Sequence, residues 1–247
     1  MEAWVALTKF EAKLFFRNII NVIFLLIFPS MMLLIFGGIY GNEPTEIYSG
    51  YGTIDMSVPA YIAMVISVTG IMNLPLVICE YRDKKILRRF RATPLNPIHI
   101  IFAQLFVNLV MTVFGMVVLI VVGKLVFNLH YWGNIGFTIL FFLLSVVSIF
   151  SIGLLIASVS PSVRAATAIA NIVFFPMLFL SGASIPLELM PKTMNIISKF
   201  LPLTYVVDGM KKVWLGQQFS TVLMDIVILL AISIACLVIS FKTFKWE

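Results

Sequence analysis

Six apolar runs of about 20 residues, separated by polar segments, dominate the sequence. An α-helix of about 20 residues crosses the hydrocarbon core of a bilayer, so an uncharged run of that length predicts such a helix. The six runs cover residues 19–40, 57–78, 100–123, 135–158, 165–183 and 222–241. Asp225, one turn into the last run, is the only charged residue within any of them. We therefore expect an all-α integral membrane protein with six transmembrane helices, built as one transmembrane domain over residues 1–247.

The composition indicates lipid as the main solvent of the folded chain. Hydrophobic residues make up 61% of the sequence and charged residues 11%, whereas soluble domains have about 25% charged residues. The net charge of +6 would suggest a nucleic-acid partner in a soluble protein. Here most of the basic residues lie in segments between or beside the apolar runs, where they set membrane topology. No nucleic-acid partner is expected.

The basic residues assign the two faces of the membrane, because loops on the cytoplasmic side are enriched in Lys and Arg. Of the 17 Lys and Arg residues, 12 lie in the N-terminal segment, the second and fourth loops and the C-terminal tail. These 12 are Lys9, Lys13, Arg17, Arg82, Lys84, Lys85, Arg88, Arg89, Arg91, Arg164, Lys242 and Lys245. Both termini are therefore expected in the cytoplasm, with the chain crossing a bacterial-type plasma membrane several times.

Residues 1–18 predict an amphipathic helix that lies on the inner leaflet. Lys9, Lys13 and Arg17 repeat every four residues on one face, and apolar side chains including Trp4 form the other. This pattern is typical of interfacial helices. Glu11 falls inside the apolar arc, where lipid would be a poor solvent for a carboxylate. Two interpretations stay open: Glu11 meets a polar or cationic group of the protein, or it snorkels at the helix edge.

The basic loop 79–97 contains a short apolar face. Ile86, Leu87 and Phe90 share this face on an otherwise basic helix, and Pro94 ends it. A loop that serves only to set topology needs the positive charges but has no use for the apolar face. The pattern fits a small helix seated in a groove of a soluble partner with acidic residues at its rim. A basic turn lying on anionic lipid is the alternative.

The outer stretch 184–220 is too long and too patterned for a plain connection. Pro186, Pro191 and Pro202 divide it into short pieces, and apolar residues recur at helical spacing in 190–201 and 206–214. Neither piece is long enough to span the bilayer. We expect an external re-entrant helical hairpin that enters the outer leaflet or caps a cavity. It would separate five transmembrane helices in 19–183 from the sixth in 222–241.

Few side chains suggest chemistry. There is no G-x-x-x-x-G-K-[S/T] phosphate loop, so any ATP must bind to a partner. His99 and His130 lie on opposite sides of the membrane with no second ligand at metal spacing, and Cys79 and Cys236 fit packing roles. The sequence thus predicts no metal, no cofactor and no enzymatic activity of its own.

The apolar runs also contain polar side chains. Asn73, Gln104, Asn108 and Asn171 could bridge neighbouring helices, or they could line a polar path. Asp225 could be a functional intramembrane acid, but its position one turn from the outer end favours a charge near water at the start of its helix.

Two segments resemble motifs of a known family. L-R-R-F-R-A-T-P-L at 87–95 resembles the coupling-loop signature of the membrane subunits of type-2 ABC exporters. S-G-A-S-I-P-L-E-L-M-P at 181–191, followed by L-P-L-T-Y-V-V-D-G-M at 201–210, is similar to that family's motif before the last helix. The chain departs from the pattern at Lys85, where such permeases commonly have glycine. The resemblance covers nearly the whole chain.

The resemblance implies an ABC-2 type permease that exports a substrate as a homodimer or heterodimer. A separate ATP-binding-cassette ATPase subunit would bind the ATP. The residues implied in coupling to that ATPase are Glu11, Asp83, Ile86, Leu87, Arg88, Arg89, Phe90 and Arg91. The residues implied in the external hairpin motif are Gly182, Pro186, Pro191, Pro202 and Tyr205. The apolar composition would suit an amphipathic drug, a lipid-like molecule or a peptide.

Two other functions deserve comparison. An ion- or proton-driven secondary carrier typically has inverted repeats and charges near the bilayer midplane, and neither is evident in the sequence. A membrane enzyme needs polar groups that converge near an interface, and the asparagines, glutamines and two distant histidines form no such set. Export therefore remains the leading hypothesis.

Overall fold

The computed structural model describes residues 11–13, 15, 19–45, 48, 50–85 and 98–244. These residues are almost entirely helical, and Pro44 and Gly52 form an isolated β-bridge. The helices are α2 (Ile19–Val22), the π-helix η1 (Ile23–Ile27), α3 (Phe28–Tyr40), α4 (Thr53–Ser67), the π-helix η3 (Val68–Asn73), α5 (Leu74–Asp83), α7 (Ile98–Phe127), α8 (Ile135–Val159), α9 (Val163–Leu180), the 3₁₀ helix η4 (Leu187–Leu189), α10 (Lys192–Ser198), α11 (Pro202–Trp214) and α12 (Phe219–Thr243).

Six helical stretches in the described part of the chain are long and apolar enough to cross a membrane. They confirm the predicted all-α fold with six transmembrane helices. The six are Ile23–Tyr40, Thr53–Asp83, His99–Phe127, Ile135–Val159, Val163–Leu180 and Phe219–Thr243. The second is longer than the predicted 57–78 at both ends, because its helix continues through the polar residues that flank the apolar run.

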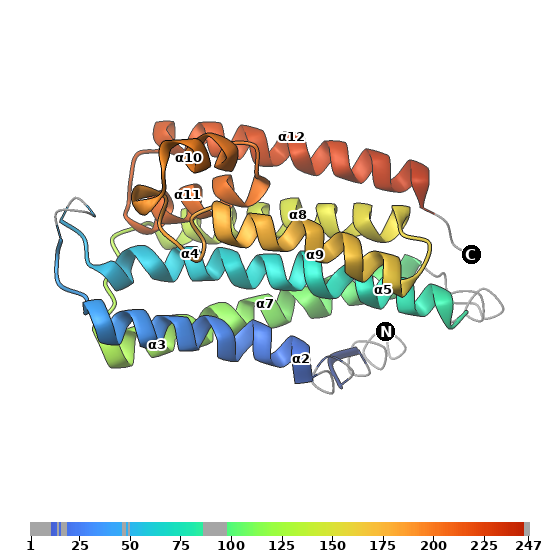
Figure 1. The fold of residues 1–247 in the computed structure, drawn as a ribbon, viewed down its shortest axis with the longest axis horizontal. Helices are drawn as coiled ribbons and strands as arrows, with labels where there is room; N and C mark the ends of the chain where they lie inside the picture. Colours follow the sequence, from blue (N-terminus) through green and yellow to red (C-terminus); the bar gives the residue numbers. More distant parts are fainter. Residues whose placement is uncertain are drawn as a thin grey trace.

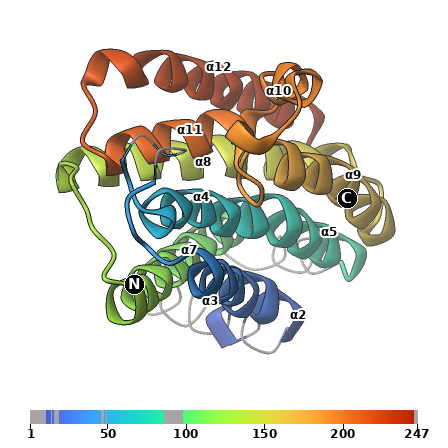
Figure 2. The same ribbon diagram turned by 60° about the vertical axis from the view of Figure 1, so that its left-hand side comes forward.

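The stretch formed by α4, η3 and α5 lies at the centre of the bundle (Figures 1 and 2), with α7 and α3 on one side and α8, α11 and α12 on the other. The most apolar part of this stretch is 83% buried, against 22% for the corresponding part of α12. Outer helices that leave large apolar side chains exposed are expected where lipid is the solvent. The packing therefore makes α4, η3 and α5 the protein-facing core of the fold.

Two prolines follow the two π-helical turns. Pro29 lies one residue into α3 after η1, and Pro75 lies one residue into α5 after η3. At the end of each π-helix the backbone N–H bonds five residues back, from Phe28 to Ile23 and from Leu74 to Thr69. Since proline has no N–H and crowds the preceding turn, a local shift to wider hydrogen bonding accommodates it.

Helix α8 crosses η3 with backbone almost in contact. A Cβ built on Gly153 would lie 1.9 Å from the carbonyl oxygen of Gly70, well inside the distance that any side-chain carbon tolerates. Small residues allow membrane helices to approach this closely. The backbone of α8 therefore packs directly against the π-helical turn at the centre of the bundle.

The two ends of the bundle differ in their connections. We call one end of the bundle the α11 end; the connections 41–52, 128–134 and 181–218 lie there. We call the other the terminal end; it contains the turn after α5, the α8–α9 turn and both ends of the described chain. Figure 1 places α10 and α11 at one end of the long axis, and the residues nearest to both termini at the other. The candidate site has components at both ends.

Candidate functional site

The predicted coupling residues Ile86, Leu87, Arg88, Arg89, Phe90 and Arg91 lie outside the described residues, so their arrangement stays a prediction. Asp83 is described and is the last residue of α5. Its Oδ2 atom accepts a hydrogen bond of 3.1 Å from the backbone N–H of Val163, the first residue of α9. A carboxylate at a helix N-terminus satisfies a free N–H group and opposes the positive end of the helix dipole.

Arg82 makes a second connection to the same turn, which the sequence analysis did not anticipate. Its guanidinium donates to the carbonyl oxygen of Ala157 at 3.4 Å and to that of Ser160. Together Arg82 and Asp83 attach the end of α5 to the α8–α9 turn. A displacement of the chain just after α5 would therefore act directly on α8 and α9.

Lys85 occupies the position where the resemblance leads us to expect glycine. Its φ angle is +55°, in the left-handed region that glycine adopts most easily. The backbone conformation at this position is therefore one that suits glycine. A non-glycine residue there carries a conformational cost of about 1 kcal/mol.

Glu11 contacts polar groups of the protein, which confirms the first of its two interpretations rather than snorkelling at the helix edge. Its side chain is 3% exposed, and its carboxylate accepts hydrogen bonds from the Tyr81 hydroxyl and the Gln104 amide. Burial raises the pKa of Glu11, although both hydrogen bonds act in the opposite direction. Glu11 thereby joins the N-terminal segment to α5 and α7.

A chain of polar contacts continues from Gln104 into the bundle. The Asn108 amide donates to the Gln104 carbonyl oxygen at 2.8 Å, and the Asn73 amide donates to Asn108 Oδ1 at 2.7 Å. One turn further, the hydroxyls of Thr69 and Thr112 lie 2.8 Å apart. Asn73 and Asn108 therefore bridge η3 and α7, and Gln104 bridges α7 and α5 through the Tyr81 hydroxyl, as one of the two sequence interpretations proposed.

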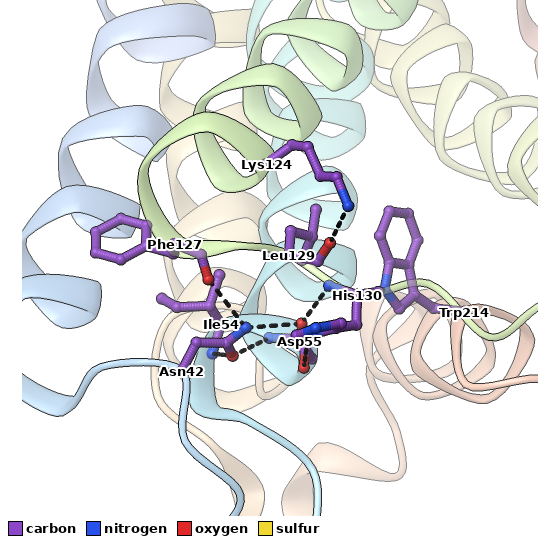
Figure 3. Close-up of polar contacts among 8 residues, drawn as sticks. All are labelled: Asn42, Ile54, Asp55, Lys124, Phe127, Leu129, His130 and Trp214. Atoms are coloured by element: carbon purple, nitrogen blue, oxygen red, sulfur yellow. Dashed lines mark hydrogen bonds and ion pairs between the residues drawn. The ribbon is translucent and has the colours of Figure 1, made fainter.

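A second polar cluster lies at the α11 end (Figure 3). Asp55 is 2% exposed, and its Oδ1 atom accepts hydrogen bonds from Asn42 Nδ2 at 3.0 Å and from the His130 backbone N–H at 2.8 Å. His130 Nδ1 lies 3.5 Å from Asp55 Oδ2, and Trp214 Nε1 donates to the His130 carbonyl oxygen at 3.0 Å. Asn42 also donates to the Phe127 carbonyl oxygen at 3.3 Å. This cluster fastens the ends of α3, α4, α7 and α11 together.

Asp225 is buried and paired, contrary to the expectation of a charge near water. It is 3% exposed, and Lys212 Nζ lies 2.9 Å from its Oδ2 atom and 2.6 Å from Asp208 Oδ2. Burial lowers the pKa of Lys212, but the two carboxylates outweigh it and hold that pKa above its usual value. The hydropathy pattern gave no indication of this ion pair, which holds the start of α12 against α11.

The predicted hairpin residues lie at the starts and turns of the short helices. Gly182 follows α9 with φ +85°, Pro191 precedes α10, and Pro202 is the first residue of α11. Proline suits a first helical turn because the missing N–H would have no partner there. The Tyr205 hydroxyl donates to the Lys199 carbonyl oxygen at 2.6 Å, which closes the α10–α11 turn.

A cavity of about 310 Å³ lies beside this motif. Pro186 and Gly182 line it together with residues of α3, α4 and the 41–52 connection. Within the described ranges, no group of three or more His, Cys, Asp or Glu side chains could hold a metal ion.

The chain is similar in sequence to proteins named as transport permeases. It is 24% identical over 194 residues to a putative transport permease, ycf38, of Porphyra purpurea, covering 78% of this chain and 67% of that protein. It is 22% identical over 179 residues to the probable multidrug ABC transporter permease YbhS of Escherichia coli, covering 71% of this chain and 47% of that protein. Nodulation protein J of Rhizobium leguminosarum bv. viciae is 34% identical over 79 residues, 32% of this chain and 30% of that protein. The matched region thus spans about two thirds of the Porphyra permease, about half of YbhS and about a third of nodulation protein J.

The family model described as ABC-2 type transporter matches residues 2–215. That region runs from the N-terminal segment to the end of α11 and includes five of the six membrane-spanning helices. With the six apolar helices and the permease names of its relatives, this match shows that the chain belongs to the ABC-2 type transporter family and is a multi-pass membrane subunit of the transport-permease kind, which is not itself catalytic.

Proposed function

We propose that this chain is the membrane-spanning part of an exporter that a separate ATP-binding-cassette ATPase drives. The observation that carries the proposal is the set of contacts at the terminal end. Arg82 and Asp83 attach α5 to the α8–α9 turn, directly before the predicted docking segment 86–91. Glu11 attaches the N-terminal segment to α5 and α7.

These contacts give a route for force from a partner into the bundle. A push on residues 86–91 would reach α8 and α9 through Arg82 and Asp83. Hydrogen bonds that involve a charged group contribute about 1.5–3 kcal/mol each, so the end of α5 and the α8–α9 turn would move as one unit. A push on the N-terminal segment would reach the centre of the bundle through Glu11 and Gln104.

The same arrangement is the basis for the proposed orientation and partners. The N-terminal segment, the second and fourth loops and the C-terminal tail contain 12 of the 17 Lys and Arg residues of the sequence, which favours a cytoplasmic position for both termini in a plasma membrane. The ATPase would dock at the terminal end, and a second permease subunit, identical or related, would complete the pathway. The substrate would leave at the α11 end, and we propose an amphipathic drug, a lipid-like molecule or a peptide.

Two of the buried acids, Asp55 and Asp225, give no support to an ion-driven carrier. A proton relay needs a carboxyl group that can exchange its partners. Asp55 and Asp225 are both held by fixed donors, one by Asn42 and the His130 backbone and the other by Lys212. They lie at the α11 end rather than at the middle of the bundle.

The test is co-purification with the cognate ATPase, followed by ATP-dependent transport in proteoliposomes. We expect Leu87→Asp and Phe90→Asp to abolish co-purification and transport, because a charge would disrupt the apolar docking face. Phe200→Asp is the matched control, since Phe200 is an 82% exposed phenylalanine at the opposite end. Association and transport that survive in both docking variants, or an intact chain that never binds an ATPase, would refute the proposal.

A further inference from the structure

The cavity at the α11 end has walls from five separate parts of the chain, one of which is the 41–52 connection with Thr45 and Tyr48. Phe36 comes from α3, Met56 and Tyr61 from α4, Ser184 from the segment after α9, and Lys211 from α11. Its volume of about 310 Å³ lies at the lower end of the range for small-molecule pockets, about 300–1,000 Å³. It is therefore large enough for a small ligand or for part of a longer one.

Most of the cavity surface is apolar, and its polar side chains carry hydroxyl groups apart from Lys211. Thr45, Tyr48 and Tyr61 contribute hydroxyl groups, whereas Phe36, Met56 and other apolar side chains form most of the remaining wall. An apolar wall with a few well-placed polar groups is typical of sites that bind amphipathic molecules. The lining is thus suited to a ligand with a large apolar body.

The charge on the cavity wall has one sign. Lys211 is the one charged side chain among the described lining residues. Burial and the nearby Glu188 carboxylate raise the pKa of Tyr48, but Glu188 is not itself among the lining residues. The neighbouring Lys212 pairs with Asp208 and Asp225. Within the described part of the chain, no ion pair is formed by Lys211. A half-buried ammonium without a counter-ion favours an anionic ligand.

A second polar group on the wall also lacks a partner. Thr45 Oγ1 is buried, and no hydrogen-bond partner for it exists among the described residues. Buried hydroxyls in folded proteins are nearly always hydrogen-bonded. An acceptor group on a bound ligand would satisfy this hydroxyl.

We propose that this cavity binds an amphipathic anion, with the apolar body against Phe36 and Met56 and the acidic group paired with the Lys211 ammonium. The inference deepens the proposed export function, because it names the substrate class as amphipathic anions. A cationic ligand would meet Lys211 with no carboxylate to compensate. A neutral ligand would leave the ammonium without a counter-ion.

The test of binding uses the full-length permease alone, in nanodiscs of zwitterionic phosphatidylcholine and without ATP. The probe is a decyl sulfonate that carries a photoreactive diazirine, and matched decyl alcohol and decyl trimethylammonium probes carry the same group. We expect the sulfonate to label the segments 36–61 and 182–189 about fivefold more strongly than the alcohol. Equal labelling by the three probes would overturn the proposal.

Four variants distinguish the effect of losing the Lys211 charge from the effect of misfolding. Lys211→Gln should lower sulfonate labelling about fivefold, to the level of the alcohol, whereas Lys211→Arg should retain it. Lys192→Gln, at an exposed lysine of α10 outside the cavity, should leave labelling unchanged. Met56→Trp, which fills the cavity, should lower labelling by all three probes. Unchanged labelling of Lys211→Gln would refute the assignment of the acidic group.

A transport measurement distinguishes an exported substrate from a resident membrane lipid. In proteoliposomes with the ATPase, ATP should drive outward movement of the sulfonate probe, and Lys211→Gln should reduce that movement. Strong labelling without ATP-driven movement of the sulfonate, in a complex that does move another substrate with ATP, would identify the occupant as a membrane lipid and overturn the substrate assignment. Because labelling needs no ATPase, a failure of the proposed export function would leave the binding result intact and identifiable.

Discussion

Replacement of Asp55 by alanine tests whether the polar cluster at the α11 end holds four helices together (Figure 3). The Asp55 carboxylate accepts hydrogen bonds at 3.0 Å from Asn42 and at 2.8 Å from the His130 backbone. At about 1.5–3 kcal/mol each, the two bonds contribute about 3–6 kcal/mol. The variant also removes the cost of keeping a carboxylate buried, which offsets part of this loss. We expect a net decrease in the free energy of unfolding of about 2–4 kcal/mol.

The assay is thermal unfolding in detergent followed by tryptophan fluorescence. Trp214 donates to the His130 carbonyl oxygen, so its fluorescence reports directly on this cluster. For a chain of this size the loss corresponds to a decrease in Tm of about 5–15 °C. Glu43→Ala is the matched control, because Glu43 is an exposed carboxylate next to Asn42 in the 41–52 connection. The Tm of this variant should stay close to that of the parent protein.

A double-mutant cycle assigns the effect to the contact between two side chains. Asn42→Ala removes the donor to Asp55 and also the bonds of Asn42 to the Phe127 carbonyl oxygen and to the backbone N–H groups of Ile54 and Asp55. The coupling between the two variants therefore measures the side-chain contact, whereas the size of either single effect does not. The Asn42→Ala/Asp55→Ala double variant should be more stable than the sum of the single effects predicts, by about 0.5–3 kcal/mol. If Asp55→Ala melts within about 2 °C of Glu43→Ala, or if the two changes are strictly additive, the cluster does not hold this end together.

Three further predictions use contacts elsewhere in the bundle. Burial raises the pKa of Glu11 above 4.5, so the stabilisation that is complete below that pH is lost as the pH rises through the higher folded-state value. Glu11→Gln should flatten the fall in Tm above pH 4.5, and an unchanged pH profile would contradict this. Lys85→Gly should relieve the strain at φ +55° and maintain or raise stability by about 1 kcal/mol, whereas Lys84→Gly, at φ −79°, should lower it in the same melt. Gly153→Ala would place a Cβ atom 1.9 Å from the Gly70 carbonyl oxygen and should lower the free energy of unfolding by about 1–3 kcal/mol. Gly38→Ala, with open space around its Cβ position, should not lower it. Equal melting temperatures of these two variants would refute the close crossing.

The sequence was sufficient to predict the helical spans because each span depends on local composition. An apolar run of about 20 residues has to be helical in lipid, whatever its neighbours are. The ends of the spans were less certain, since the prediction stopped at charged residues. Asp55 and Asp83 extend the second span because tertiary partners satisfy their carboxylates.

The polar partners could not be predicted, because they are distant in sequence. Asn42 and Asp55 lie 13 residues apart, and Asp55 and His130 lie 75 apart. The sequence suggested that Glu11 required a polar partner, yet nothing in it pointed to Gln104, which is 93 residues away. Charge counting assigned Arg82 to a face of the membrane, but its contact with the Ser160 carbonyl oxygen depends on how α5 packs against α8.

Polar contacts hold both ends of the central span, and its middle contains an irregular turn. Buried carboxylates fix the α11 end through Asp55 and Asp225, and the terminal end through Glu11. Between them lies η3, where the helix changes to wider hydrogen bonds before Pro75. Asn73 holds this turn to α7, and π-helical turns are frequent at functional sites. We infer that force applied at the terminal end bends the central span at η3 and so moves α4, which forms one wall of the cavity. Amide hydrogen exchange should then be faster in η3 than in the middle of α4, and equal protection of the two would contradict the inference.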